Sequence, residues 1–290
     1  MQKDSFVAFD TAVSQSLPEA VSQTQSDLIT AAGNWAGKGL HAILEYLKKI
    51  LGIIAFFVFW EVASRTGLID SVFIPPFSRV VTAFYGLLAS GELAYHASAS
   101  LMRALAGLGL AIVVALPLGL MIGQIRVVER FLDPLLQMFR QTSTLALLPV
   151  FILLLGLGET SKIMMIFWGV QWPILLNTIS GAKNIDPVLL KSARSIGTPK
   201  IKLLWKIVIP GALPSIFTGV RLGATSAVLL LIAAEMVGAS VGLGFAVFDF
   251  EVKYKIPEMF AVILSFTILG LALNYLLVFL ERKIIKWKQE

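Results

Sequence analysis

The sequence predicts an all-α, polytopic membrane protein, and three observations support this class. The chain has 290 residues, is 57% hydrophobic and has a mean hydropathy of +0.83. Only 14% of its residues are charged, whereas about 25% are charged in an average soluble domain. Four stretches hold no charged residue and approach the roughly 18–20 residues that span a bilayer as a helix: 104–125, 141–158, 163–182 and 259–280.

The chain begins with a polar region that we separate, as residues 1–45, from a transmembrane domain over residues 46–290. Residues 1–37 are polar and lack the apolar core of a secretory signal. From Trp35 to Lys49, apolar residues recur at helical spacing with charged residues between them. This pattern predicts a helix lying on membrane lipid, and a plain lead-in to the first span is the alternative.

Six spanning helices are predicted, and the basic residues between them orient the chain. Sixteen Lys and Arg fall on the flanks that are cytoplasmic if the N-terminus is inside, and five fall on the opposite flanks. Both termini are therefore expected in the cytoplasm. Because topology explains the positive charge, we expect no nucleic-acid partner. The spans are residues 50–66, 101–124, 141–157, 162–181, 213–236 and 258–281.

Three features are predicted at the outer ends of the spans. Glu61 and Arg65 lie four residues apart, which suits an ion pair on one helix face. After Pro75 and Pro76, residues 80–94 are expected to form a short helix. The glycine-rich turn at 238–244 precedes an apolar segment, 245–250, which we interpret as a re-entrant segment or short gate helix.

The longest inner loop, about 183–213, contains signals for two helices. Asp186 is suited to cap a helix that has Pro187 at its first position and runs over 188–196, and Gly197 is suited to end it. A second basic helix over 199–208 is expected to stop before Pro210.

Polar residues inside the spans are candidates for a solute pathway, because polar side chains at membrane depth must face protein or water. Arg140 leads four hydrogen-bonding side chains into the third span, and the fourth span carries further polar tips. The alternatives are back-bonding of Ser and Thr to the helix and, for Trp, anchoring at the interface. The candidates are Gln141, Thr142, Ser143, Thr144, Trp168, Gln171, Trp172 and Asn177.

Arg221 and Glu235 complete the pathway candidates in the fifth span. They are fourteen residues apart, about 21 Å along one helix face, and so cannot pair with each other. Each needs another partner. Structural roles compete with solute contact here: Glu235 as the cap of a neighbouring helix, and Arg221 with a partner near the inner loop.

Several chemistries are excluded. With no cysteine, the chain has no disulfide, thiol nucleophile, thiolate zinc site or iron–sulfur cluster. Its two histidines, His41 and His96, are far apart, so no metal site is expected. The sequence shows no paired carboxylates and no Ser–His arrangement of the kind an enzyme would need. The segment from Gly33 to Gly39 has the wrong spacing for a phosphate-binding loop.

The inner loop and five other motifs resemble a known family. The loop places Ser192-Ala193, Gly197, Ile207 and Pro210 in the signature spacing of ATP-binding-cassette importer permeases, with Lys191 where Glu is usual. Members of this family often have prolines in the segment where this chain has Thr142, Ser143 and Thr144. Over about residues 50–285, the chain resembles the subfamily for nitrate, sulfonate, taurine and bicarbonate. The other motifs are FIPP from Phe73, Gly107 with PLGL from Pro117, GLGETSK from Gly156, GALPSIFTGVR from Gly211, and AAEMVGAS from Ala233 with GLG from Gly242.

This resemblance implies a permease of the type I importer fold in a bacterial inner membrane, without catalytic residues or a cofactor of its own. Two copies would form a pathway for a small solute by alternating access. Two ATPase subunits would bind ATP and Mg²⁺, and an extracytoplasmic binding protein would deliver the solute. The inner loop would be the coupling element, through Lys191, Ser192, Ala193, Arg194, Ser195, Ile196, Gly197, Lys200 and Pro210.

The competing hypothesis is a secondary transporter driven by an ion gradient. Such a carrier needs buried carboxylates for the coupling ion, and inverted repeats are common in this class. Leaving aside the first and last residues of the predicted spans, only Glu61 and Glu235 qualify, and no inverted repeat is visible. The ATP-driven importer is therefore the leading hypothesis.

Overall fold

The computed structural model describes residue 48 and residues 50–285, and the regular elements in this part of the chain are helices. The chain divides into two units, up to Ile69 and from Asp70 onwards, which are described separately. The tail at 1–45 lies outside the described residues, and so does the surface helix expected from Trp35 to Lys49, apart from Lys48.

The first unit contributes a helix over residues 50–65. Its apolar side chains are largely exposed, as suits a lipid-facing helix. Near its end, Arg65 Nε donates to Glu61 Oε1 at 2.5 Å. The ion pair expected from the four-residue spacing is confirmed.

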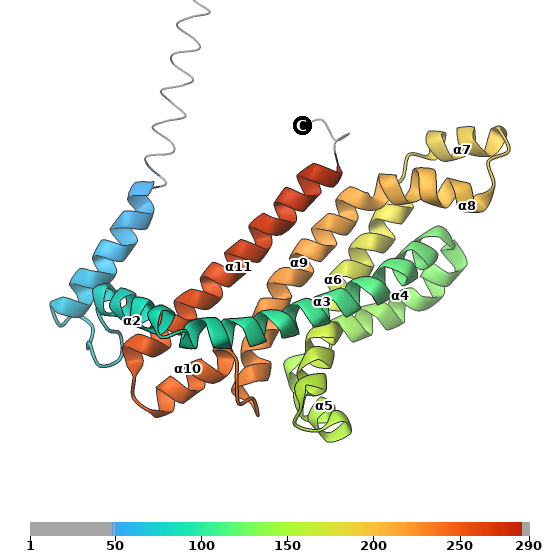
Figure 1. Cartoon of the computed structure of the whole chain (residues 1–290). Coiled ribbons are helices and arrows are strands. Elements are labelled where there is room, and N and C mark those ends of the chain that lie inside the picture. Colours follow the sequence, from blue (N-terminus) through green and yellow to red (C-terminus); the bar gives the residue numbers. More distant parts are fainter. Residues whose placement is uncertain (1–47, 49, 286–290) are drawn as a thin grey trace, which may run out of the picture. The chain divides into compact units, whose positions relative to one another are not determined.

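The second unit is built of helices joined by short connections (Figure 1). The segments long and apolar enough to cross a membrane are α3, α6, α11 and the continuous run from Lys200 to Met236, and α4 and α5 form a bent pair. The elements are α2 (Phe77–Ala89), α3 (Glu92–Gln124), α4 (Arg126–Gln141), η1 (Leu145–Leu147), α5 (Leu148–Leu155), α6 (Glu159–Lys183), α7 (Pro187–Ser195), α8 (Lys200–Leu203), η2 (Leu204–Val208), α9 (Ile209–Met236), α10 (Leu243–Val252) and α11 (Ile256–Ile284).

Helix α6 forms the centre of this unit and packs extensively against α3 and α9. Glycines allow the close approach, because a side chain at these positions would meet the neighbouring helix. A Cβ on Gly107 would lie 2.6 Å from the Ile166 side chain, and one on Gly119 would lie 2.7 Å from Thr178. Met165 and Ile174 of α6 are fully buried between these neighbours.

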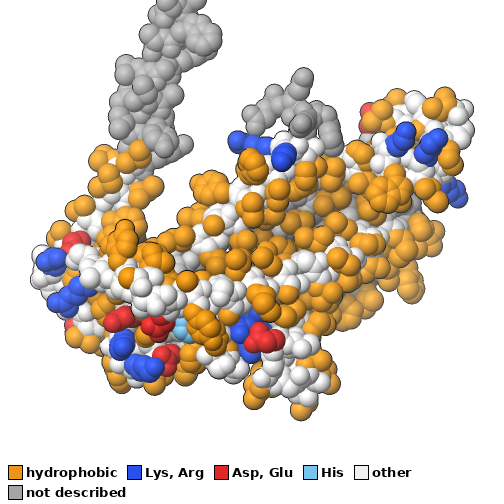
Figure 2. Space-filling model, in the orientation of Figure 1, with side chains coloured by type: hydrophobic (Ala, Val, Ile, Leu, Met, Phe, Trp, Pro, Cys, Tyr) orange, Lys and Arg blue, Asp and Glu red, His pale blue; other side chains and the backbone are white. Residues whose placement is uncertain are grey.

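The outward faces of the long helices are apolar. Orange side chains cover the visible lengths of α9 and α11, whereas Lys and Arg side chains gather over α7 and α8 (Figure 2). This distribution is the reverse of a soluble protein's and fits helices surrounded by lipid. We call the end of the long helices that carries α7 and α8 the α7 end, and the opposite end, where α10 lies, the α10 end.

The expected third span, 141–157, is wrong as a continuous helix. Helix α4 begins earlier, at Arg126, and ends at Gln141, and α5 follows at an angle of 80°. Pro149 at the start of α5 suits a helix beginning there, because the first turn needs no amide donor. The Arg126–Arg140 segment, expected to be an inner connection, is therefore a helix of the membrane domain.

Two other boundaries also differ from the sequence interpretation. The expected helix at 80–94 is two helices, because α2 ends at Ala89 and α3 begins at Glu92 after Gly91, whose φ is 79°. The second inner-loop helix does not stop before Pro210. It passes through the π-helical turn η2 directly into α9. Such a widened turn accommodates the amide that proline lacks.

Candidate functional site

The α4–α5 bend is a polar, non-helical segment. Regular helix ends at Gln141 and resumes at Leu145. Gln141, Thr142 and Ser143 are exposed, and Thr144 is half-buried. The Thr142 hydroxyl donates to the Met138 carbonyl at 3.3 Å, which is the back-bonding alternative raised for this segment. The structure thus brings four of the expected pathway residues together at the bend.

Helix α4 is fastened to α6 at both of its ends. Near the α7 end, Lys183 Nζ donates to Glu129 Oε1 at 2.7 Å. Near the bend, the Phe139 ring stacks on Trp172 with centroids 5.9 Å apart and meets Trp168 edge-on at 5.8 Å. The two tryptophans, expected to line a pathway, thus pack α4 against α6.

The bend lies near the middle of α6. The Thr144 side chain lies against Gly169, where an added Cβ would come within 3.1 Å of the Thr144 hydroxyl. Gly169 follows the start of α6 at Glu159 by ten residues and precedes its end at Lys183 by fourteen. At 1.5 Å per residue, these separations are roughly 15 Å and 21 Å. The non-helical segment is therefore at mid-depth among membrane-crossing helices.

The other two candidates on α6 are directed into the protein. Gln171 is buried. The Asn177 amide donates to the Pro173 carbonyl at 2.8 Å, and its Cβ lies close to Gly219 of α9, within 2.8 Å of an added Cβ there. Asn177 therefore lies at the α6–α9 contact.

Arg221 and Glu235 do not contact each other, as their separation along the helix required. Arg221 Nη2 donates to Glu281 Oε2, which joins α9 to the last turns of α11. This is the structural partner near the inner loop that we considered for Arg221. Glu235 lies at the other end of α9, in a separate polar cluster.

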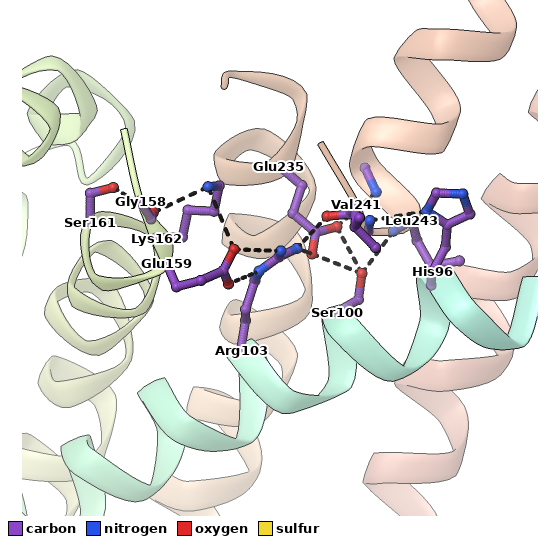
Figure 3. Close-up of polar contacts among 12 residues, drawn as sticks. His96, Ser100, Arg103, Gly158, Glu159, Ser161, Lys162, Glu235, Val241 and Leu243 are labelled. Atoms are coloured by element: carbon purple, nitrogen blue, oxygen red, sulfur yellow. Dashed lines mark hydrogen bonds and ion pairs between the residues drawn. The ribbon is translucent and has the colours of Figure 1, made fainter. Parts of the chain in front are cut away.

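That cluster is centred on Arg103 of α3 (Figure 3). Its guanidinium binds both oxygens of Glu159 at the start of α6, Nε at 2.5 Å and Nη2 at 2.8 Å. Nη1 donates to Glu235 Oε1 at 2.5 Å and to the Val241 carbonyl at 2.6 Å. The side chains of Arg103 and Glu235 are 5% and 0% exposed. A buried charge needs such pairing, since an unpaired ion in a low-dielectric interior is strongly unfavourable.

The same cluster caps α10. The backbone amide of Gly242 donates to His96 Nδ1 at 3.1 Å, that of Leu243 to the Ser100 hydroxyl at 2.8 Å, and that of Gly244 to Glu235 Oε2 at 2.8 Å. These are amides at a helix start, which have no partner within their own helix. The capping role considered for Glu235 is therefore confirmed (Figure 3).

Sequence reasoning missed Arg103 as the centre of this cluster. The available signal was an arginine inside an apolar span, which requires a partner. His96, Ser100 and Arg103 also recur at intervals of four and three residues, which places them on one face of α3. Neither signal identifies Glu159 as the second partner, because it lies 56 residues away.

The first inner-loop helix, α7, forms as expected around its cap. The Asp186 side chain accepts from the Val188 amide at 2.8 Å, Pro187 opens α7, and Gly197 follows it with φ of 74°. Ala193 is buried against Leu203 of α8. The remaining residues expected to couple to an ATPase are exposed, except for the half-buried Pro210: Lys191, Ser192, Arg194, Ser195, Ile196, Gly197 and Lys200.

Comparison with known proteins shows the family of this chain. Residues 115–286 match the family described as binding-protein-dependent transport system inner membrane component. The putative aliphatic sulfonates transport permease SsuC of Bacillus subtilis is 33% identical, over 84% of this chain and 88% of its own length. The taurine transport permease TauC of Escherichia coli is 32% identical, over 80% and 86%. The bicarbonate transport permease CmpB of Synechocystis is 33% identical, over 83% and 89%.

A solved structure shares the fold. The inward-facing MetNI methionine transporter superposes with a TM-score of 0.56 over 65% of this chain and 92% of the matched chain, at 20% identity. The fold is thus that of a type I importer permease, and the membrane-embedded helices are those of a transport subunit. The chain belongs to the family of binding-protein-dependent transport system inner membrane components, as a permease subunit of an ATP-binding-cassette importer.

Proposed function

We propose that two copies of this chain form the pathway of an ATP-driven importer for a small sulfonate or a similar oxyanion, with the α4–α5 bend lining that pathway. The bend carries the proposal. Non-helical backbone at membrane depth is tolerated only where protein or water covers it. Gln141, Thr142 and Ser143 are exposed at mid-depth, so lipid is an unfavourable neighbour for them.

The energy source would be a pair of separate ATPase subunits that hold ATP and Mg²⁺. The chain has no phosphate-binding loop, because its nearest glycine segment, Gly33 to Gly39, lacks the required spacing. The α7–α8 loop is the surface we assign to the ATPase. Its exposed Lys191 and Arg194 and the left-handed turn at Gly197 are presented together at one end of the membrane helices. A rigid helix fixed by Ala193 can transmit a push into α9.

The solute class is inferred from relatives whose names specify aliphatic sulfonates, taurine and bicarbonate. These small solutes share a singly charged anionic group, a sulfonate or a bicarbonate oxyanion. An extracytoplasmic binding protein would deliver the anion at the α10 end. The distribution of Lys and Arg along the sequence would place both chain termini on the cytoplasmic side of a bacterial inner membrane.

The test is purification of the tagged chain with the ATPase and binding protein encoded beside it, followed by reconstitution into vesicles. We expect two ATPase subunits per two copies of this chain, ATPase stimulation by one loaded binding protein, and anion uptake that requires ATP. Uptake that proceeds without ATP and collapses when an ion gradient is dissipated would instead support the secondary transporter.

A further inference from the structure

The polar residues of α4 form a continuous stripe. Successive positions along this stripe fall within about 80° on a helical wheel. The stripe consists of five exposed side chains, Arg126, Arg130, Asp133, Gln137 and Arg140. The opposite flank presents Phe131 and Met138, which are 81% and 70% exposed and apolar. Helix α4 therefore has a polar wall, which is this stripe, and an apolar wall.

The stripe leads from the bend to the α7 end of the membrane helices. At that end, it opens into a hollow of about 590 Å³. The stripe carries three arginines and one aspartate. Glu129, which lies beside the stripe, is paired with Lys183. A route along this wall is thus polar throughout and carries excess positive charge. The hollow is lined by Arg126, Glu129, Arg130, Asp133, Pro134 and Lys183.

Arg140 is the stripe's deepest charge. It lies between Phe139, which stacks on Trp172, and the bend at Thr144, which lies against Gly169. Arg140 is thus level with the middle of α6. Among the described residues, no carboxylate lies within ion-pairing distance of its guanidinium. An exposed, unpaired arginine at this depth is strongly unfavourable in hydrocarbon and marks an ion or substrate route in membrane proteins.

We infer that Arg140 binds the transported anion, as the mid-membrane contact for a sulfonate-type oxyanion carrying one negative charge. The inference rests on the proposed function and specifies which residue recognises the solute. A guanidinium presents two parallel N–H donors that match two oxygens of one oxyanion. The Gln141 amide and the Ser143 hydroxyl, exposed at the bend, supply neighbouring hydrogen bonds to the remaining oxygen.

A purely structural role for Arg140 is the competing account. A cation in the last turn of a helix interacts favourably with the helix dipole, and α4 ends one residue later. That role stabilises α4 and requires no solute route at the bend. The two accounts therefore differ in whether a small probe in water reaches Ser143 and experiences the electrostatic potential of Arg140.

The first experiment measures this potential with thiol reagents, because the chain has no cysteine of its own. Ser143→Cys is introduced into the full chain, purified with its ATPase and reconstituted. The cysteine is then modified with sulfonate-bearing and trimethylammonium-bearing thiosulfonates of similar size. We expect the sulfonate reagent to react faster, and Arg140→Gln to lower the anionic-to-cationic rate ratio about tenfold, as removal of one nearby charge in a partly aqueous site implies.

Controls keep the test decisive. Arg140→Lys retains the charge and is expected to retain most of the preference, while Arg79→Gln on α2 removes a distant exposed charge and is expected to change nothing. Gln141→Cys replaces Ser143→Cys if that variant is not recovered. An equal ratio in the parent and Arg140→Gln proteins overturns the assignment of Arg140. A cysteine that reacts with neither reagent overturns both this assignment and the pathway at the bend.

The second experiment measures uptake of a radiolabelled alkylsulfonate by the reconstituted complex. Arg140→Gln is expected to reduce uptake about tenfold at low solute concentration while the ATPase remains bound, with partial recovery in Arg140→Lys. Unchanged uptake in Arg140→Gln contradicts the inference and leaves the importer intact. A parent complex that hydrolyses ATP but transports no oxyanion contradicts the proposed solute class, independently of the thiol measurement.

Discussion

Arg103 holds four separate parts of the chain together at the α10 end. It bonds to Glu159 of α6, to Glu235 of α9 and to the carbonyl of Val241, which leads into α10. Because Glu235 also caps α10 through the Gly244 amide, one ion cluster fixes where α3, α6, α9 and α10 meet. Such fixed placement suits the end of the molecule at which we expect the solute to enter.

Replacement of Arg103 by Leu is expected to destabilise the protein strongly. The change leaves Glu235 buried without its cation, and breaking a buried pair in this way costs about 3–5 kcal/mol. Lys253→Leu, directly after α10, is the matched control, because its pair with Asp249 is exposed and is worth less than about 1 kcal/mol. Thermal unfolding of the two purified variants measures the difference, and equal melting temperatures would contradict the role assigned to Arg103.

The sequence allowed some of these residue-scale contacts to be anticipated, but not others. The Glu61–Arg65 pair and the Asp186 cap follow from spacing along a single helix. Arg221 and Glu235 each required a partner, because an unpaired charge at membrane depth is unfavourable. The sequence did not identify those partners, which are Glu281 for Arg221 and Arg103 for Glu235. Contacts between distant helices depend on how those helices are rotated and stacked, which local spacing does not determine.

At the scale of elements, glycines set the distance between the central helices. Gly107 and Gly109 lie two residues apart in α3 but face different surroundings. A Cβ on Gly107 would lie 2.6 Å from the Ile166 side chain and 3.2 Å from the Ile163 carbonyl, whereas one on Gly109 would meet nothing within 4 Å. The same substitution should therefore have opposite effects at the two positions.

We expect Gly107→Ala to lower stability by about 1–3 kcal/mol, because α3 and α6 must separate to admit the methyl group. Gly109→Ala is expected to be neutral or to stabilise α3 by up to about 1 kcal/mol, since Ala favours the helix more than Gly does. Melting temperatures of the two variants in detergent test this. A loss of stability at both positions would indicate that helix spacing is not the cause.

The α7–α8 element yields a prediction about partner binding. Gly197 has a left-handed backbone and no atom near an added Cβ, so a large side chain there would project from the loop. Gly197→Trp is expected to abolish recovery of the ATPase with the tagged chain. Gly197→Asn should retain it, because Asn tolerates this backbone conformation.

Gly91→Trp is the control for strain, since Gly91 also has a positive φ of 79° and open space but lies at the α10 end. It should still be purified with the ATPase. If Gly197→Trp retains full ATPase binding and its stimulation by the loaded binding protein, the loop is not the coupling surface. If Gly91→Trp loses the ATPase as well, a general effect of strain accounts for both variants.

Element boundaries explain where the sequence interpretation failed. The apolar run 141–158 resembles one span, but the polar residues at its start break the helix and α5 turns by 80°. The α4 segment was assigned to a connection because it holds five charged residues: Arg126, Glu129, Arg130, Asp133 and Arg140. Average hydropathy cannot reveal a helix with one polar wall inside a membrane protein, although helical periodicity can.

For the whole molecule, the all-α membrane class and the permease family were both predictable from the sequence. Composition and the length of the apolar runs determine the class, and six motifs in order over residues 50–285 indicated the family, which the matches to SsuC, TauC and CmpB confirm. The number of continuous spans was less predictable. In the described chain, four segments cross by length and composition, and the bent pair α4–α5 adds a broken fifth.

The central claim is that the polar wall of α4 and the bend that follows it line an aqueous pathway. The most direct test is a scan of single cysteines with a membrane-impermeant thiol reagent, applied to the cysteine-free chain in its reconstituted complex. Our account predicts rapid modification of Gln137→Cys, Gln141→Cys and Ser143→Cys, and slow modification of Phe131→Cys and Met138→Cys on the apolar wall. Modification that is uniformly absent, or faster on the apolar wall, would contradict it.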